Sequence, residues 1–400
     1  MAINTDPKKI DEILSRSIDK VYPTKEALRE LLSSGRQLKI YMGIDPTADY
    51  VHIGHSTNYL ILERLHQLGH KIIVLVGDFT AMIGDPSDKT SARVQLSRED
   101  VNRNLESFKD QIGKILNFED KDNPIEFRFN SEWLGKLDFA KLIDLASNFT
   151  VQQMLERDMF AKRLKENKPL YVQEFFYPLM QGYDSVALDV DLEIGGTDQT
   201  FNMLAGRILE KRYLDKEKLV MTTTLLTNPV TGEKLMSKSL GTGVSLKDSP
   251  DNMFGKVMAI ADEGMIQVFI DCTRLTMGEI EAKKKRLEQG ENPRDLKLEL
   301  AKAIVAMYYD DQIAETAQAN WQKTFSQKET PEEITEFKPS AYDLITVLVE
   351  SGLAESKSEA KRAIEQNGVK VNEETVTDPK LELKPGDVVQ KGKRFFVKLS

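Results

Sequence analysis

Two of the chain's four histidines lie in the tetrapeptide His52-Ile53-Gly54-His55. An apolar stretch precedes it and a segment with helical periodicity follows, so it is expected at a helix N-terminus, where backbone N–H groups attract phosphate. Gly54 would let a flat base or ribose approach the backbone closely. The imidazoles could donate to phosphate oxygens as negative charge accumulates. The plainer alternative is a pair of histidines that caps a helix.

A second cluster, residues 232–241, reads Gly-Glu-Lys-Leu-Met-Ser-Lys-Ser-Leu-Gly and is expected to be a mobile loop between glycines. Lys234 and Lys238 are four residues apart, a spacing that suits a clamp on pyrophosphate. Lys238 could close on the leaving phosphates when its charge is most useful. Taken by itself, this segment could equally be a solvated basic loop.

The elements that would position the histidines form a βαβ unit. Residues 38–45 and 71–76 are predicted strands, and residues 54–68 are the helix between them, with Gly69 as its stop. The second strand is apolar throughout, as a strand covered on both faces should be. Further buried strands are expected at 125–129, 190–194 and 219–222, and helices at 139–156 and 200–211. This order predicts a doubly wound α/β domain with a parallel sheet.

Beyond this α/β order the sequence pattern changes, and the change predicts the following division of the chain into domains. A Rossmann-type catalytic domain at 1–228 is followed by a mobile loop at 229–246, a helical domain at 247–325, a linker at 326–340 and a small α+β domain at 341–400. Helices are expected at 279–289 and 293–309, and a last strand at 391–398. The small domain contains ten Lys/Arg and ten Asp/Glu, so it is neutral.

Composition limits the class of protein. The chain has 400 residues, of which 40% are hydrophobic and 30% charged, which predicts two or three soluble domains. No stretch has the length of a signal peptide or a membrane span, so a cytoplasmic enzyme is expected. A lone cysteine, Cys272, excludes an internal disulfide and a thiolate-rich zinc site. The net charge of −9 means that any nucleic acid must bind to local basic patches.

The two clusters together carry a resemblance. His52-Ile53-Gly54-His55, followed roughly 180 residues later by Met236-Ser237-Lys238-Ser239, resembles the paired signature of class I aminoacyl-tRNA synthetases. Segments 41–47, 83–87, 177–184 and 195–199 resemble the tyrosyl branch of that family, in order, and the resemblance covers essentially the whole chain. Leu235 departs from the pattern, because the family usually has lysine there. Whether Lys234 serves as the first lysine is left open.

For the amino acid, the resemblance implies a pocket that recognises a phenol. Asp184 would accept the phenolic proton and the Tyr41 hydroxyl would donate to the same oxygen, so that phenylalanine would leave both groups unpaired. The other assigned residues are Tyr177, Gln181 and Asp85 at the α-amino group, Gln199 at the carboxyl group and Asn130 near the ring. Core packing is the alternative for Tyr177 and is preferred for Tyr183.

For the nucleotide, the resemblance implies ATP accompanied by Mg²⁺, without a metal held in a protein cage. The residues assigned to ATP are Asp45, Thr47, His52, Gly54, His55, Gly196, Asp198, Met236, Ser237 and Lys238. Lys89 and Arg93 resemble mobile cations that reach pyrophosphate, although a solvated loop is the alternative. Catalysis is therefore assigned to His52, His55, Lys234, Lys238, Lys89 and Arg93.

The C-terminal domain resembles a small RNA-binding fold of a ribosomal protein, with the order helix, helix, short strand. Lys357, Lys361 and Arg362 would face phosphate, which positions an RNA without reading its bases. Without the resemblance they are ordinary exposed cations. The implied partners are L-tyrosine, tRNA(Tyr) and a second copy of the chain.

The reaction implied is activation of tyrosine to its adenylate, followed by transfer to the 3′ end of the tRNA. The nearest rival is the tryptophanyl branch, which would need an indole pocket in place of Tyr41 and Asp184. A non-catalytic RNA-binding relative and a nucleotidyltransferase are the rivals from other classes.

Overall fold

The computed structural model describes residues 3–87, 96–232, 234–235, 243–326, 336–354, 356–392 and 395–400. Its internal contacts divide the chain into two compact units, Met1–Gln318 and Ala319–Ser400. Each unit is described by itself. Among the described helices, none combines the length and apolar character needed to cross a bilayer.

The first unit is built on a six-stranded sheet with the order β1-β6-β5-β2-β3-β4. The strands are β1 (Ile18–Tyr22), β2 (Lys39–Ile44), β3 (Lys71–Val76), β4 (Glu126–Phe129), β5 (Leu192–Gly196) and β6 (Leu219–Thr223). Neighbours from β2 to β6 pair in parallel, and only β1 is antiparallel, to β6. The predicted doubly wound α/β fold is confirmed, and each predicted strand of this domain is present within a residue or two.

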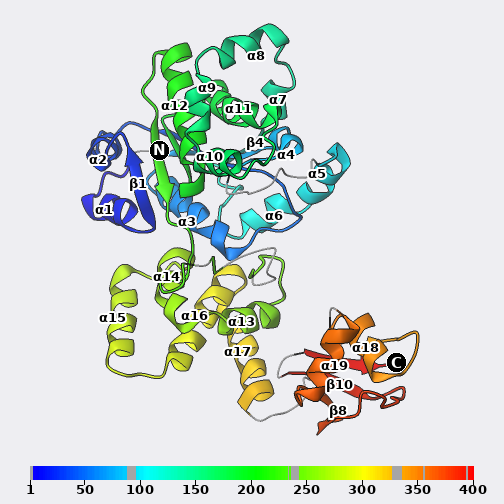
Figure 1. The fold of residues 1–400 in the computed structure, drawn as a ribbon. Coiled ribbons are helices and arrows are strands. Elements are labelled where there is room, and N and C mark those ends of the chain that lie inside the picture. The colour runs from blue at the N-terminus through cyan, green and yellow to red at the C-terminus, as the bar shows by residue number, and fades with distance from the viewer. Residues whose placement is uncertain are drawn as a thin grey trace. The chain divides into compact units, whose positions relative to one another are not determined.

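Helices surround this sheet, as the blue to green part of Figure 1 shows. They are α1 (Pro7–Ser15), α2 (Lys25–Ser33), α3 (Ile53–Gln67), α4 (Thr80–Ile83), α5 (Arg98–Leu105), α6 (Phe108–Gly113), α7 (Ser131–Leu134), α8 (Phe139–Ala146), α9 (Val151–Leu155), α10 (Asp158–Lys165), α11 (Val172–Leu188) and α12 (Thr200–Leu214). One prediction is wrong in part, because the helix expected at 139–156 is two helices. Thr150 caps α9 by accepting from the Gln153 N–H, which starts a new helix.

Residues 243–326 contain helices and no strand, as predicted. They are α13 (Pro250–Met258), α14 (Met265–Cys272), α15 (Met277–Glu288), α16 (Pro293–Tyr308) and α17 (Asp311–Ser326). Figure 1 shows α13 to α16 gathered next to one another. The Sγ of Cys272, on buried α14, lies 3.4 Å from the carbonyl oxygen of Ile53, and the hydroxyls of Ser56 and Tyr308 are 2.5 Å apart. These contacts hold the N-terminus of α3 against α14 and α16.

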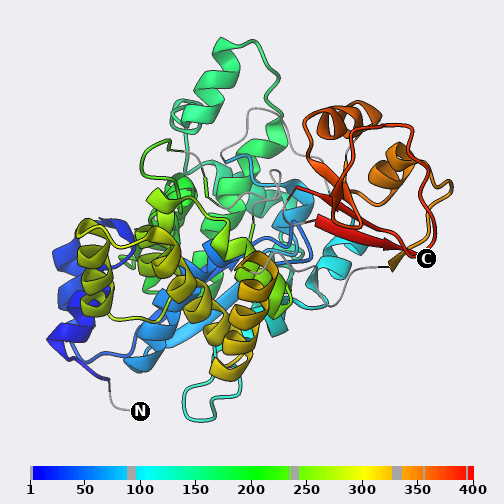
Figure 2. The same cartoon turned by 90° about the horizontal axis from the view of Figure 1, so that it is seen from below.

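The described residues of the second unit, which begins within α17, form a five-stranded sheet with the order β7-β11-β10-β8-β9 and the helices α18 and α19, visible in Figure 2 in orange and red. Its elements are β7 (Glu336–Phe337), α18 (Leu344–Glu350), α19 (Lys357–Glu365), β8 (Val369–Val371), β9 (Glu374–Thr375), β10 (Val388–Lys391) and β11 (Phe395–Leu399). The single strand predicted at 391–398 is wrong in part, because residues 395–398 belong to β11 whereas Lys391 belongs to β10. Gly392, with a φ of 63°, ends β10 at a turn, and β11 returns antiparallel to it.

Candidate active site

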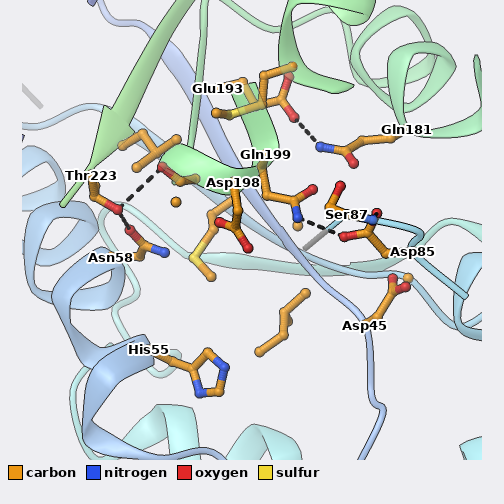
Figure 3. A pocket seen from close by; sticks show the side chains of 18 of the residues that line it. Asp45, His55, Asn58, Asp85, Ser87, Gln181, Glu193, Asp198, Gln199 and Thr223 are labelled. Atoms are coloured by element: carbon orange, nitrogen blue, oxygen red, sulfur yellow. Dashed lines mark hydrogen bonds between the residues drawn. The ribbon is translucent and has the colours of Figure 1, made fainter. Parts of the chain in front are cut away.

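A cavity of about 350 Å³ lies where β2 and β5 end. The carboxyl ends of parallel strands are the usual ligand site of an open α/β sheet. Fourteen of the residues predicted for ATP, tyrosine or catalysis line it: Asp45, Thr47, His52, Gly54, His55, Asp85, Asn130, Tyr177, Gln181, Asp184, Gly196, Asp198, Gln199 and Lys234. Residues up to 189 positions apart in the chain, Asp45 and Lys234, therefore meet in one cavity. Figure 3 shows part of this lining.

His52 and His55 stand at the start of α3. Their rings are stacked with centroids 3.7 Å apart, and the backbone N–H of His52 donates to Nδ1 of His55 at 3.3 Å. The backbone N–H of Ile53 in turn donates to the carbonyl oxygen of Val244 at 2.9 Å, which fixes this turn against the last residues of the predicted loop at 229–246. The histidines therefore both shape the helix N-terminus and line the cavity, so the capping interpretation and the functional one are compatible.

Asp184 is the central acidic residue of the cavity. It projects from α11 and is only 3% exposed. Its Oδ1 accepts from the indole Nε1 of Trp133 at 2.7 Å, and its Oδ2 accepts from Nδ2 of Asn130 at 3.3 Å. Burial raises the pKa of Asp184 well above its usual value, and the two hydrogen bonds oppose that shift. Asp184 is thus a buried acceptor held in one orientation, in the same cavity as His52 and His55.

Tyr41, on β2, is the residue whose hydroxyl the resemblance assigns to the phenol together with Asp184. It is fully buried, its hydroxyl is 2.9 Å from Oγ of Ser185, and it is absent from the described residues that line the cavity. Burial and the neighbouring carboxyl groups of Glu193 and Asp184 raise the pKa of its phenol. In this arrangement the hydrogen-bond donors to Asp184 are Asn130 and Trp133, and the Tyr41 hydroxyl pairs with Ser185.

A second acidic residue, Asp85, is joined to Gln199 across the cavity. Nε2 of Gln199 donates to Oδ2 of Asp85 at 2.7 Å, as drawn in Figure 3. The Ser87 backbone N–H donates to the other oxygen at 2.9 Å. Behind them, Nη2 of the buried Arg157 donates to Oγ of Ser87 at 2.8 Å. Asp85 is therefore a carboxylate with a defined orientation and a guanidinium nearby.

A third carboxylate, Asp45, follows β2. Its two oxygens accept from the Tyr177 hydroxyl at 2.9 Å and from Oγ1 of Thr80 at 2.8 Å. A Cβ on Gly77 would lie 1.9 Å from Oδ1 of Asp45, so only glycine fits there. Burial and the carboxylates of Asp45 and Asp85 raise the pKa of Tyr177. Tyr177 therefore connects the part of the cavity near Asp45 with the part near Asp184.

The end of the cavity near Gly196 and Lys234 has close backbone packing. A Cβ on Gly196 would lie 2.5 Å from Oδ1 of Asp198, which agrees with a site where a ligand approaches the main chain. Lys234 lines the cavity. The neighbouring Leu235 packs on Gly264, where an added Cβ would be 2.6 Å from a Leu235 methyl carbon. The leucine that departs from the family pattern thus faces a helix terminus, and the lysine before it faces the cavity.

Some predicted residues lie outside the described part of the chain: Lys89, Arg93, Met236, Ser237 and Lys238. Among the residues that are described, no group of three or more His, Cys, Asp or Glu side chains is arranged to hold a metal ion. In the second unit, Lys357, Lys361 and Arg362 are exposed on α19. Ala360 and Ile364 of the same helix are buried in the core of that unit.

Sequence reasoning missed several residues of the site, namely Asn58, Thr80, Ser87, Trp133, Arg157, Glu193 and Thr223. Asn58 could have been found, because it lies on the same helical face as His55, one turn further along α3. Its Oδ1 accepts from the Thr223 hydroxyl at 2.7 Å. The other missed residues lie near the site only because segments that are distant in the sequence pack together there.

The comparisons with known proteins agree with this geometry. Residues 33–326 match the family model of class I tRNA synthetases for tryptophan and tyrosine (W and Y), and residues 344–389 match the S4 domain model. The chain belongs to the class I tRNA synthetases and ends in an S4 domain.

Relatives that align with the whole chain show which branch of the family it belongs to. The tyrosine–tRNA ligase of Haemophilus influenzae is 44% identical over 397 residues, covering 99% of this chain and 98% of the relative. That of Moorella thermoacetica is 42% identical over 395 residues, covering 97% and 94%. The chain is a member of the tyrosine branch of the family, an enzyme family that uses ATP.

Solved structures share the fold. A C-terminally truncated mitochondrial tyrosyl-tRNA synthetase from Aspergillus nidulans has a TM-score of 0.66 at 22% identity, covering 79% of this chain and 94% of that one. The tyrosyl-tRNA synthetase of Archaeoglobus fulgidus, solved with L-tyrosine, has a TM-score of 0.62 at 22% identity, covering 78% and 99%.

Proposed function

We propose that this cavity activates L-tyrosine with ATP and transfers it to tRNA(Tyr). The observation that carries the proposal is the position of Asp184, a buried acceptor in the cavity that also contains His52 and His55. A phenol can be distinguished from a phenyl ring only by a hydrogen-bonding partner that phenylalanine leaves unpaired. Asp184 offers that partner.

The orientation of the side chains supports the following assignment of tyrosine contacts. Asp184 accepts the phenolic O–H, with Asn130 and Trp133 holding its carboxyl group in place. Asp85, Gln181 and Tyr177 surround the α-ammonium, where acceptors offset the positive charge. Gln199 lies next to Asp85 and serves the tyrosine carboxylate.

ATP occupies the other end of the cavity. Asp45, Thr47, Gly54, Gly196 and Asp198 border the nucleotide. His52 and His55 donate to its phosphates at the N-terminus of α3. Met236, Ser237 and Lys238 of the loop close over it, and Lys234, Lys238, Lys89 and Arg93 attract the pyrophosphate. Mg²⁺ enters with the nucleotide and neutralises phosphate charge.

In the first step, a carboxylate oxygen of tyrosine attacks the α-phosphorus in line. The bond from that phosphorus to the bridging oxygen breaks, and pyrophosphate leaves with the electron pair. No side chain forms a covalent bond, so the protein acts by positioning and by charge stabilisation. In the second step, a ribose hydroxyl of the tRNA 3′ end attacks the adenylate carbonyl, and AMP leaves.

The domains divide this work. Residues 1–228 hold the two small substrates, the loop at 229–246 closes on them, and the helices at 247–325 bind the tRNA. After the linker at 326–340, the domain at 341–400 contributes Lys357, Lys361 and Arg362 to tRNA phosphates.

We also propose that the chain works as a homodimer in the cytoplasm. Large apolar side chains are exposed between residues 139 and 172, including Phe139 (77%), Ile143 (57%), Val151 (66%) and Val172 (71%). Exposed apolar side chains concentrated in one region favour association with a partner. Sedimentation of the purified protein would give one species of twice the chain mass if the proposal holds, and a monomer would contradict it.

The test of the reaction is pyrophosphate exchange dependent on the amino acid. Exchange with tyrosine is expected, and exchange with tryptophan alone would move the chain to the other branch. Binding of RNA without exchange for any amino acid would make it a non-catalytic RNA-binding protein. Lys238→Ala should reduce activation strongly while tyrosine binding, measured by equilibrium dialysis, changes little.

A further inference from the structure

A buried ion pair lies behind the cavity wall. The Nζ of Lys218, whose side chain is 0% exposed, is bonded to Oε2 of Glu193, whose side chain is 1% exposed. The same ammonium donates to Oγ of Ser185 at 2.7 Å. Removing two charges from water costs more than their attraction commonly returns, so stability alone is a poor reason for such a pair. The alternative reason for the buried pair is a role in the neighbouring cavity.

The fold makes room for this ammonium. Gly206 lies on α12, and a Cβ added there would be 2.5 Å from the Nζ of Lys218 and 2.6 Å from Oγ of Ser185. The backbone of α12 can approach this closely only because residue 206 has no side chain. Lys218 immediately precedes β6, and Glu193, on the adjacent β5, is paired with Val220, two residues after Lys218. Residues two apart in a strand point to the same face, so the sheet brings both side chains to one side. The pair is therefore a constructed site.

The pair reaches the cavity through Glu193. Its Oε1 accepts from Nε2 of Gln181 at 3.1 Å, as Figure 3 shows, and both Glu193 and Gln181 line the cavity. An ionised carboxylate can only accept hydrogen bonds, so the amide of Gln181 must turn its NH₂ toward Glu193. Its carbonyl oxygen then points away from Glu193. That oxygen is the group an ammonium ligand requires.

We propose that Lys218 and Glu193 are positioning residues for the α-amino group of the amino acid, acting through the orientation of Gln181. The inference rests on the proposed role of Gln181 in tyrosine binding. The Nζ of Lys218 and the Oγ of Ser185 both donate to Oε2 of Glu193, so Oε1 stays directed at the NH₂ of Gln181 and the carbonyl oxygen of Gln181 stays available to the ammonium. Without Lys218, Glu193 loses its cationic partner at a buried position, and its carboxyl group rearranges toward the donors that remain. The amide of Gln181 then loses its fixed orientation.

Lys218→Met is the direct test, because methionine has nearly the length of lysine and no charge. Three ligands distinguish a loss of contact with the amino group from a general loss of binding. Tyrosine has both the amino group and the carboxylate. Tyramine keeps the amino group and lacks the carboxylate, and 3-(4-hydroxyphenyl)propionate lacks the amino group. In pyrophosphate exchange, the KM for tyrosine and the inhibition constant of tyramine should rise about tenfold, the size of one lost hydrogen bond. The inhibition constant of the propionate, the kcat and the KM for ATP should stay within about twofold.

Rescue distinguishes positioning from a merely structural role. In the double variant Lys218→Met/Glu193→Gln, a neutral amide replaces the carboxylate and can still accept from Gln181. The KM for tyrosine should return to within about threefold of the wild type. If Lys218→Met does not fold, Lys218→Gln, which is also uncharged, gives the same comparison of ligands.

Arg163→Met is the matched control. It breaks the buried ion pair between Arg163 and Glu174, two residues that are not part of the cavity lining. Arg163→Met should lower the stability of the protein, but the ratio of its affinity for tyramine to its affinity for the propionate should not change. An equal loss of affinity for all three ligands in Lys218→Met, or no recovery in the double variant, would overturn the inference. Absence of tyrosine-dependent exchange in the wild type would instead refute the proposed function.

Discussion

The indole Nε1 of Trp133 donates to Oδ1 of Asp184 at 2.7 Å, and Asp184 is almost fully buried. Trp133 lies on α7, directly after β4, whereas Asp184 lies in the middle of α11. The bond stabilises the charged form of a carboxyl group whose pKa burial raises. Trp133 therefore helps to keep Asp184 an acceptor for a phenol.

Trp133→Phe should weaken tyrosine binding, because one hydrogen bond to the carboxylate is lost. The expected rise in the KM for tyrosine is about tenfold, equivalent to about 1.4 kcal/mol. The KM for ATP should not change. Trp321→Phe replaces the chain's other tryptophan, which does not line the cavity, and serves as the control. Equal effects of the two substitutions would argue against a specific role of Trp133.

Tyrosine affinity should depend on pH through Asp184. Burial raises the pKa of Asp184, so this carboxyl group takes up a proton at a higher pH than a solvated aspartate does. A protonated carboxyl group is no longer a charged acceptor for the phenolic O–H. As the pH falls through the raised pKa, the KM for tyrosine should therefore increase. Asp184→Asn should give a high KM that is nearly independent of pH, and a wild-type KM that varies with pH no more than that of the variant would count against the assignment.

Stability should fall as the pH rises from about 4.5 to 7 because of Glu210. Burial raises its pKa from 4.5 to about 7, and its Oε1 accepts from the backbone N–H of Val190. In this range the folded protein binds the proton and the unfolded chain has lost it, so raising the pH favours unfolding, by up to about 3 kcal/mol. Glu210→Gln keeps the acceptor and removes the titration. Denaturant unfolding at pH 5 and pH 8 should show a smaller difference in the variant than in the wild type.

Gly264→Ala tests whether Leu235 sets the position of Lys234. The new methyl group would meet Leu235 at 2.6 Å and displace it, and the adjacent Lys234 would move in the cavity. Because the tip of a leucine can rotate, a rise of only about threefold in the KM for ATP is expected. Gly255→Ala on α13 is the control, since nothing lies within 4 Å of the added Cβ. The idea fails if both variants behave like the wild type.

The sequence predicts the parts of the fold that depend on local pattern. The strand at 71–76 was expected from its unbroken apolar run and is β3. In contrast, β1 escaped prediction because only Val21 of its five residues is buried, so no apolar pattern marks it. The strand expected at 391–398 failed because Gly392 permits a turn that hydrophobic periodicity does not reveal.

The residues of the candidate site likewise divide into those that a local sequence pattern predicts and those that it does not. His52 and His55 could be placed because their function depends on a local transition from strand to helix. Lys218 and Glu193 could not, because a buried lysine is recognisable only after the packing of β6 against α12 is known. Trp133 could not be placed for the same reason, because its contact with Asp184 depends on how α7 packs against α11.

The most direct test of the central claim is the ratio of kcat/KM for tyrosine to that for phenylalanine in pyrophosphate exchange, measured for the wild type and for Asp184→Asn. If Asp184 recognises the phenol, the wild type strongly prefers tyrosine, and the variant loses most of that preference through a lower value for tyrosine. A variant that retains the wild-type ratio would contradict the account.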